Sequence, residues 1–302
     1  MKNLICYTST LLVMLVAASF AAPRVGDKDT EFSVNVLKNA DAEESIDSTY
    51  YGNYRITDDH HLGIDRFITD DGKNAMLVSD YSTGVVRRLF AVADSRFVMG
   101  PGFNTEAPAE LTLTFVKDKQ GELKGVSLRN AQGVEQFAQR VPLREERVSF
   151  LNADAKLDGT LLIPSTKGPH PAIVLLHGSG PLTRYSFGPY PHFFTSLGFA
   201  VLIYDKRGAG SSTGSRMDAS TGAAMKNSLY PDELADDALA AMRTLLQRKD
   251  IDHDKIGFWG SSEGGMLATQ VASRSPQVAF VINSSGFMEP LWQILRYQAE
   301  AI

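Results

Sequence analysis

Three apolar runs, each followed directly by a glycine-rich turn, mark the second half of the chain. They are residues 172–176 (AIVLL), residues 199–204 (FAVLIY) and the shorter run 256–259 (IGFW). Such runs are typical of strands that are buried on both faces of a parallel sheet. Residues 278–282 (VAFVI) show the same pattern, and helical stretches separate the runs. The pattern therefore predicts an α/β domain with a mostly parallel sheet and helices on both of its faces.

Residues 50–143 show a different pattern, in which apolar and polar residues alternate. Leu111, Leu113 and Phe115 alternate with threonines at positions 112 and 114. This period of two is expected for strands that bury only one face. Turn signals that end in glycine recur along the segment, at residues 71–72, 101–102, 120–121 and 132–133. We therefore predict a small all-β domain, built as a meander or a small barrel, ahead of the α/β domain at residues 144–302.

The first 21 residues have the composition of a signal peptide. Lys2 supplies a positive charge, residues 11–18 form a short apolar core, and residues 19–21 (SFA) form a cleavage site. A membrane anchor is the alternative, but a span needs about 20 apolar residues and this core is shorter. We expect export to the periplasm or the extracellular space, with no stable membrane span after cleavage. Residues 22–49 are polar and acid-rich, and are expected to form a linker.

Composition narrows the classes of partner. The 302 residues carry a formal net charge of −5 and no basic cluster, so nucleic acids and anionic membrane surfaces are not predicted partners. The single cysteine, Cys6, lies in the predicted signal peptide, so the mature chain needs no disulfide. His60 and His61 follow two aspartates, but nothing else has the spacing of metal ligands, which favours a solvated loop. We predict no metal and no cofactor, and the oligomeric state stays open.

The third apolar run leads into Gly260-Ser261-Ser262-Glu263-Gly264, which has the pattern G-x-S-x-G. Residues 266–272 continue as a predicted helix. A strand, a tight turn and a helix are the context of a nucleophile elbow, in which the serine adopts a strained backbone conformation. The first amides of the helix would favour negative charge beside Ser262. The alternative interpretation is an ordinary glycine- and serine-rich turn after a buried strand.

The three glycine-rich turns resemble those of a known fold. They are residues 177–180 (HGSG), 205–211 (DKRGAGS) and 260–265 (GSSEGG). In this order and spacing they resemble the α/β-hydrolase superfamily, and within it bacterial serine hydrolases near the prolyl-oligopeptidase and acyl-thioesterase branches. Residues 50–54 and a predicted hairpin at 113–128 resemble the lipocalin-like β domain that accompanies some bacterial serine hydrolases.

The resemblance implies acyl transfer to water, with Ser262 as the nucleophile that forms an acyl-enzyme. The amide of Glu263, the residue after the nucleophile, would stabilise the oxyanion. A second amide would come from Gly178 or Ser179, in the loop after residues 172–176. Removing one such donor typically lowers turnover by about 10²–10³. The side chain of Glu263 as a general acid is the less favoured alternative, because it would leave the site along the helix.

Three further residues are expected to support these loops. In the families that the chain resembles, the histidine at the position of His177 is not a member of the triad. We therefore predict that His177 shapes the oxyanion loop. Asp205 and Arg207 are predicted to brace their own turn, and a direct contact with substrate is the less favoured alternative.

The chain departs from the family at the triad acid and base. The family order is serine, then aspartate or glutamate, then histidine. After Ser262 the sequence contains neither a histidine nor an aspartate, and all six histidines lie upstream. We therefore expect an N-terminal part of a hydrolase that ends in the lid region, lacks the triad acid and base, and is inactive alone. A fragment, a frameshifted product and a non-catalytic remnant would share this sequence.

Three functions fit these features. The first is hydrolysis of a carboxylic ester or a thioester, with a small-molecule acyl substrate. The second is a peptidase of the prolyl-oligopeptidase type, in which the β domain gates or positions a peptide. The third is a non-catalytic chain that binds a ligand through its β domain. The identity of the substrate stays open, because the lid that would determine it is mostly absent.

Overall fold

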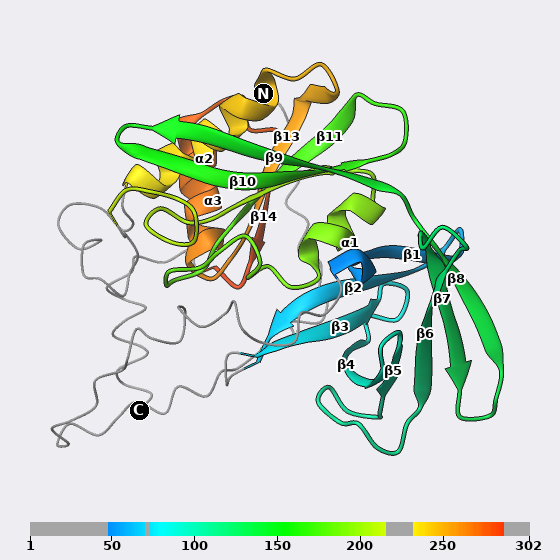
Figure 1. Cartoon of the computed structure of the whole chain (residues 1–302). Coiled ribbons are helices and arrows are strands. Elements are labelled where there is room, and N and C mark those ends of the chain that lie inside the picture. The colour runs from blue at the N-terminus through cyan, green and yellow to red at the C-terminus, as the bar shows by residue number, and fades with distance from the viewer. Residues whose placement is uncertain (1–47, 70–72, 216–231, 287–302) are drawn as a thin grey trace, which may run out of the picture.

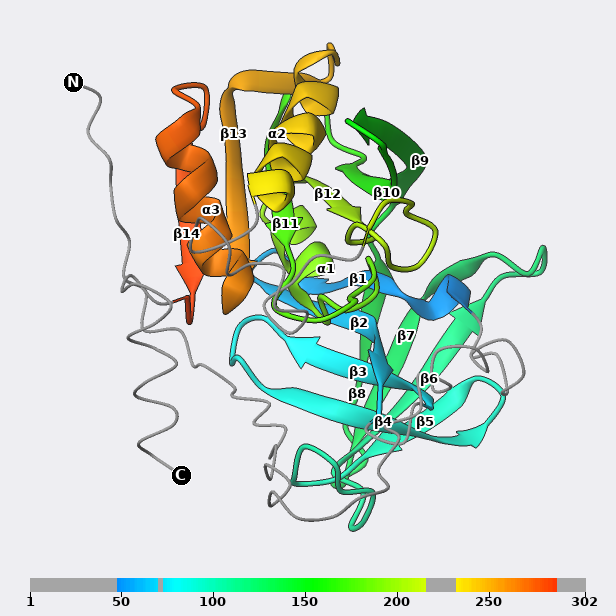
Figure 2. The same cartoon turned by 90° about the vertical axis from the view of Figure 1, so that its left-hand side faces the viewer.

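The computed structural model describes residues 48–69, 73–215 and 232–286, which form a closed β-barrel and a six-stranded sheet (Figures 1 and 2). The predicted signal peptide at 1–21, nearly all of the predicted linker and the predicted lid segment at 287–302 lie outside the described residues. Among the described helices, none is long and apolar enough to cross a membrane.

The barrel follows a short 3-10 helix, η2 (Ser48–Tyr50), and each of its strands pairs antiparallel with the next. Its eight strands are β1 (Gly52–Thr57), β2 (His60–Ile68), β3 (Asn74–Asp80), β4 (Val86–Ala93), β5 (Arg96–Met99), β6 (Leu111–Lys117), β7 (Leu123–Asn130) and β8 (Glu135–Arg140). The barrel closes where Tyr54 of β1 lies opposite Arg140 of β8. Closure removes the free edges that an open sheet of this size would expose.

The alternation of residues along the strands fills the barrel with apolar side chains. Leu113 and Phe115 of β6 point inward and are buried, as do Val126 and Leu128 on β7. Aromatic rings pack against one another in the interior, where Tyr50 stacks on Phe115 at 3.9 Å between ring centroids. The inward face of each strand therefore supplies a core that belongs to the barrel alone.

The second half of the chain forms a mixed sheet with the strand order β14-β13-β11-β12-β10-β9. The strands are β9 (Leu143–Asn152), β10 (Ala155–Pro164), β11 (His170–Leu176), β12 (Ala200–Tyr204), β13 (Ile251–Ser261) and β14 (Phe280–Ser284). The apolar runs correspond to β11, β12, β13 and β14, which are parallel to one another. In contrast, β10 pairs antiparallel with both β9 and β12.

The predicted fold class, a mostly parallel sheet with helices on both faces, is wrong for this chain. Strands hold 47% of the described residues, and eight of them form an antiparallel closed barrel. The described residues contain only three α-helices, α1 (Tyr190–Ser196), α2 (Asp232–Leu246) and α3 (Glu263–Arg274). The prediction gave too much weight to the uninterrupted apolar runs. Such runs report only strands buried on both faces, whereas alternating strands make up the barrel, and an apolar run does not show that β10 pairs antiparallel with β9 and β12.

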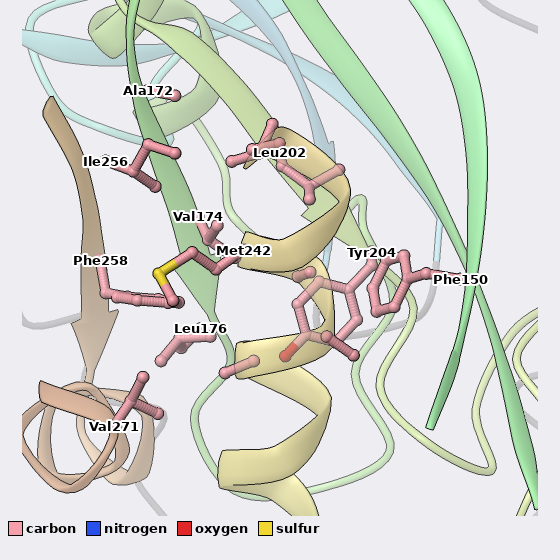
Figure 3. Packing of buried hydrophobic residues seen from close by; sticks show 14 of the residues in the cluster. Phe150, Ala172, Val174, Leu176, Leu202, Tyr204, Met242, Ile256, Phe258 and Val271 are labelled. Carbon is pink, nitrogen blue, oxygen red and sulfur yellow. The ribbon is translucent and has the colours of Figure 1, made fainter. Parts of the chain in front are cut away.

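Helices α2 and α3 cover one face of the sheet and enclose its main core (Figure 3). Figure 3 shows Met242 of α2 reaching toward Phe258 of β13 and Val174 of β11. Phe150 and Tyr204 meet edge to face at 5.5 Å. A second cluster, which includes Phe194 of α1 and Trp259, takes the side chains that alternate with those of the first. Packing on both sets of side chains holds the carboxyl ends of β11, β12 and β13 in fixed positions.

Helix α1 lies between the sheet and strands β1 and β2 of the barrel (Figures 1 and 2). The side-chain amide of Asn53 donates hydrogen bonds to the carbonyl of His192 and to the hydroxyl of Thr195, both at 2.9 Å. Nδ1 of His192 lies 2.5 Å from Oδ1 of Asp65. The ring of Tyr81 packs edge to face on Phe193 at 5.3 Å. These contacts form a polar seam that joins the barrel to α1.

Candidate active site

Ser262 lies in the turn between β13 and α3, with φ 54° and ψ −122°. A positive φ is costly for a residue with a side chain, and such strain is concentrated at functional sites. The turn is held by hydrogen bonds, because the amide of Ser262 donates to the carbonyl of Ser284 at 3.0 Å. The carbonyl of Ser262 accepts from the amide of Gly265 at 3.0 Å. The backbone of α3 and the end of β14 therefore hold Ser262 in its strained conformation.

The glycines of the turn allow close backbone contacts. A Cβ atom on Gly260 would lie 2.1 Å from the carbonyl oxygen of Gly264. A Cβ atom on Gly264 would lie 2.2 Å from the carbonyl oxygen of Leu176, at the end of β11. Both distances are too short for a side chain, so helix α3 can lie this close to β13 only with glycine at position 260, and this close to β11 only with glycine at position 264.

The loop after β11 lies directly beside Ser262. A Cβ atom built on Gly178 would be 3.8 Å from Cβ of Ser262 and 3.5 Å from the carbonyl oxygen of Ser261. Glu263, on the other side of Ser262, is the first residue of α3, so its amide lies at the positive end of that helix. The backbone at Gly178 and the first residue of α3 therefore lie on two sides of Ser262.

A buried network joins the loops around Ser262. Nζ of Lys206, in the loop after β12, donates hydrogen bonds to Oε1 of Glu263 at 2.5 Å and to the carbonyl of Gly178 at 3.0 Å. The hydroxyl of Ser179 donates to Oε2 of Glu263 at 3.0 Å. Lys206 and Glu263 are 4% and 1% exposed. Both carboxylate oxygens of Glu263 thus have partners, and the network joins the β11 loop, the β12 loop and the start of α3.

His177 is buried beside this network. Its Nε2 lies 3.2 Å from the carbonyl of Thr183, and its ring packs at 4.4 Å on Phe187 and at 5.5 Å on Tyr204. Burial and the nearby positive charge of Lys206 lower the pKa of His177 to about 3. His177 is therefore neutral at pH 7 and its contacts are with the loop that it begins.

Asp205 and Arg207 each anchor the β12 loop through buried ion pairs. Asp205 accepts hydrogen bonds from Nε and Nη2 of Arg184, at 3.0 and 2.8 Å, and from the amide of Ser211. Burial alone would raise the pKa of Asp205, but the hydrogen bonds from Arg184 outweigh it and lower that pKa. Arg207 binds Asp237 of α2 through Nε at 3.0 Å and Nη2 at 2.7 Å. Both residues therefore contact protein partners around the loop.

The structure brings Ser262, Glu263, Gly178 and Ser179 together at the carboxyl ends of β11 and β13. His177, Asp205 and Arg207 lie in the surrounding loops. No histidine among the described residues is hydrogen-bonded to Ser262. His177 is instead paired with the carbonyl of Thr183, and His192 with Asp65. Sequence reasoning missed Lys206, although it lies between two residues that were singled out. Its partner Glu263 is 57 positions away, so no local pattern signals the pair.

The chain is similar in part to several known proteins. Residues 185–300 match the model of the prolyl oligopeptidase family. An esterase, EstD from Thermotoga maritima, is 31% identical over 176 residues, which are 55% of this chain and 39% of that protein. The thiohydrolase aneE from Aspergillus aculeatus is 29% identical over 47% of this chain and 42% of its own. Among solved structures, an α/β hydrolase, GrgF from Penicillium sp. sh18, is 21% identical with a TM-score of 0.40, covering 53% of each chain.

Ser262 lies in a strand–turn–helix elbow at the carboxyl edge of the sheet. The match to the prolyl oligopeptidase family and the esterase relative support a serine hydrolase of the α/β-hydrolase superfamily. The chain spans about two fifths of the length of the curated relatives named above.

Proposed function

We propose that the protein hydrolyses carboxylic esters or thioesters through an acyl-enzyme on Ser262. The observation that carries the proposal is the strained conformation of Ser262 between Gly260 and Gly264, with Gly178 beside it. This geometry supports attack by the serine oxygen on a carbonyl carbon from a turn that packing holds in place.

The oxyanion is assigned two donors. The amide of Glu263 is one donor, and the amide of Gly178 or Ser179 is the other. Negative charge develops on the carbonyl oxygen as the Ser262–carbon bond forms, and the alcohol or thiol leaves when the carbonyl re-forms. Water then attacks the acyl group and releases the acid and the serine hydroxyl. A base must take the proton of Ser262 in the first step, and the described residues do not assign one.

Two relatives support the ester and thioester classes, since one is an esterase and another a thiohydrolase. A second candidate is peptide hydrolysis, which is favoured by the match of residues 185–300 to the prolyl oligopeptidase family. Both reactions would use the same serine and the same oxyanion donors, and they differ in the leaving group.

The experiment measures hydrolysis by the whole protein that contains this sequence. Three substrates are compared: a p-nitrophenyl ester, an acyl thioester and an aminoacyl amide. We expect turnover of the ester or thioester to be lost in Ser262→Ala and kept in Ser261→Ala, a control at the adjacent position. Turnover that survives Ser262→Ala would contradict the nucleophile, and preferential cleavage of the amide would favour the peptidase.

The base can be tested separately on the 302-residue chain. Since no described histidine is bonded to Ser262, we expect little phosphonylation of Ser262 by a fluorophosphonate probe in buffer alone, a reaction in which the serine oxygen would bond to phosphorus and fluoride would leave. Added imidazole supplies a general base and should raise the labelling rate in the unsubstituted chain but not in Ser262→Ala. Fast labelling without imidazole would show that a residue of this chain acts as the base, and His177 and His192 would then be exchanged one at a time.

A further inference from the structure

A cavity of about 720 Å³ lies between the barrel and the sheet, and Ser262 is not among the residues that line it. The barrel contributes Tyr51, Arg66 and Arg140, and the second half of the chain contributes Leu162, Tyr185 and Phe187. Sites for small molecules commonly have volumes of roughly 300–1,000 Å³ and often lie between domains. The size and place of the cavity are therefore those of a ligand site.

Two guanidinium groups in the wall have no carboxylate partner among the described residues. Arg140 donates hydrogen bonds only to uncharged oxygens, the carbonyls of Thr49 at 2.6 Å and Tyr51 at 2.8 Å and the hydroxyl of Tyr54 at 2.9 Å. Arg66 donates through Nε to the side-chain oxygen of Asn74 at 2.9 Å, and its guanidinium lies over the ring of Tyr185 at 5.0 Å.

The third arginine of the wall differs from Arg66 and Arg140, because it has carboxylate partners. Arg184 is buried and forms ion pairs with both Asp158 and Asp205, so its charge is already balanced. The acids of the wall do not balance the other two arginines. Asp65 is paired with His192 at 2.5 Å, and Glu122 and Glu145 are exposed. Arg66 and Arg140 therefore present positive charge to the cavity with no carboxylate bound to either among the described residues, an arrangement that attracts an anion.

Tyr51 lines the cavity together with Arg66 and Arg140. Arg140 donates to the carbonyl of Tyr51, and the charge of Arg66 acts on its hydroxyl. Burial raises the pKa of that hydroxyl, Arg66 lowers it in part, and Asp65 raises it, with a raised value as the result. The hydroxyl therefore stays protonated at neutral pH and can donate a hydrogen bond.

We propose that this cavity binds a small organic anion, a carboxylate attached to an apolar body, with Arg66 and Arg140 as its charged partners. A planar guanidinium matches a carboxylate with two parallel hydrogen bonds. Leu162, Phe187 and the ring of Tyr185 offer contacts for the apolar body. A ligand in this place touches the barrel and the sheet at once, so its binding stabilises their arrangement.

The test uses isothermal titration of the full chain with sodium hexanoate and with hexanamide, which has the same shape without the charge. We expect saturable binding of hexanoate, at least about tenfold weaker binding of hexanamide, and weaker hexanoate binding as salt is added. Arg66→Gln should weaken hexanoate binding by about tenfold, and Arg66→Lys, which keeps the charge, should weaken it less. Arg96→Gln, an exposed arginine of the barrel outside the cavity, should have no effect.

Three results would overturn the proposal: no saturable binding of hexanoate, equal binding of hexanamide, or hexanoate binding that is unchanged in Arg66→Gln. A thermal melt of each variant separates loss of binding from loss of folding. Ser262→Ala should bind hexanoate as the unsubstituted chain does, so the outcome does not depend on the proposed hydrolysis.

Discussion

At the scale of single residues, the turn at Ser262 depends on glycines, because there is no room for a side chain at their positions. Gly264→Ala would place Cβ 2.2 Å from the carbonyl oxygen of Leu176 and 2.7 Å from that of His177. Backbone oxygens cannot move aside as a flexible side chain would, so we expect the substitution to lower the free energy of unfolding by about 1–3 kcal/mol. Urea denaturation measures this change.

Gly178→Ala is the matched control for that substitution. Its Cβ would meet its nearest atom at 3.5 Å, an ordinary contact, and its φ is not in the left-handed region. We expect stability close to that of the unsubstituted chain. Equal stability of Gly264→Ala and Gly178→Ala would show that α3 can move away from β11 at little cost.

His177 gives a second prediction at this scale, on the dependence of stability on pH. Its pKa is lowered from 6.5 to about 3 in the folded chain, first by burial and then by Lys206. The unfolded chain therefore binds more protons than the folded one between pH 3 and pH 6.5. The stabilisation is complete above pH 6.5 and is lost as the pH falls toward 3.

We expect His177→Phe to reduce the slope of unfolding free energy against pH, between pH 6.5 and 5, by up to about 1.4 kcal/mol per pH unit. Denaturant titrations at several pH values measure the slope. His253→Gln, at an exposed histidine, should leave the slope unchanged. An unchanged slope in His177→Phe would mean that His177 takes up a proton without unfolding.

At the scale of elements, Lys206 joins the β12 loop to the β11 loop and to the start of α3 through one ammonium group. Lys206→Met would leave the buried carboxylate of Glu263 with only the hydroxyl of Ser179 from this network. Removing one partner of a buried ion pair typically costs about 3–5 kcal/mol, so we expect a loss of that size in unfolding free energy. The double variant Lys206→Met/Glu263→Gln should lose less, because it removes the unpaired charge.

Lys255→Met serves as the comparison, since Lys255 forms an exposed ion pair with Asp252 at 2.8 Å. Exposed pairs contribute little, so its stability should hardly change. If Lys206→Met and Lys255→Met lost the same amount, the buried network would not be what holds the loops together.

Some features at the scale of elements could be predicted from the sequence, and others could not. The order of strand, turn and helix around Ser262 was readable because the elbow needs glycines at fixed spacings within five residues. The buried pairs Lys206–Glu263 and Arg184–Asp158 were not readable, since their members are 57 and 26 positions apart. The antiparallel edge of the sheet was also missed. Residues 157–163 can be recognised in the sequence as an apolar-rich strand. Whether that strand is parallel or antiparallel depends on which strand it pairs with.

At the scale of the whole molecule, the polar seam joins the barrel to α1, and we expect it to make the two halves unfold together. Asn53 is 3% exposed and serves two acceptors on α1. Asn53→Ala would remove this donor from both acceptors, although the carbonyl of His192 still accepts a hydrogen bond from the hydroxyl of Thr195 at 2.9 Å. A buried group left unsatisfied costs about 1–3 kcal/mol. We expect a lower melting temperature and a heat-capacity peak that separates into two transitions in differential scanning calorimetry.

Asn104→Ala, in a barrel loop outside the seam, should keep a single transition. The same single peak in Asn53→Ala would show that the remaining contacts, Asp65–His192 and Tyr81–Phe193, suffice for cooperative unfolding. The seam itself has no sequence signature, because Asn53 and Thr195 are 142 positions apart and each looks like an ordinary polar residue.

The docking of α1 also bears on the order of events during protein synthesis. Helix α1 has seven residues, and isolated helices shorter than about 12–15 residues are barely stable in water. The barrel precedes α1 in the chain, so it leaves the ribosome first, and domains generally fold as units from the amino terminus. The folded barrel would then offer Asn53 and Asp65 as hydrogen-bonding partners when the residues of α1 emerge. In a circular permutant that places the barrel after the sheet, α1 would emerge before these partners exist, so the permutant should fold more slowly.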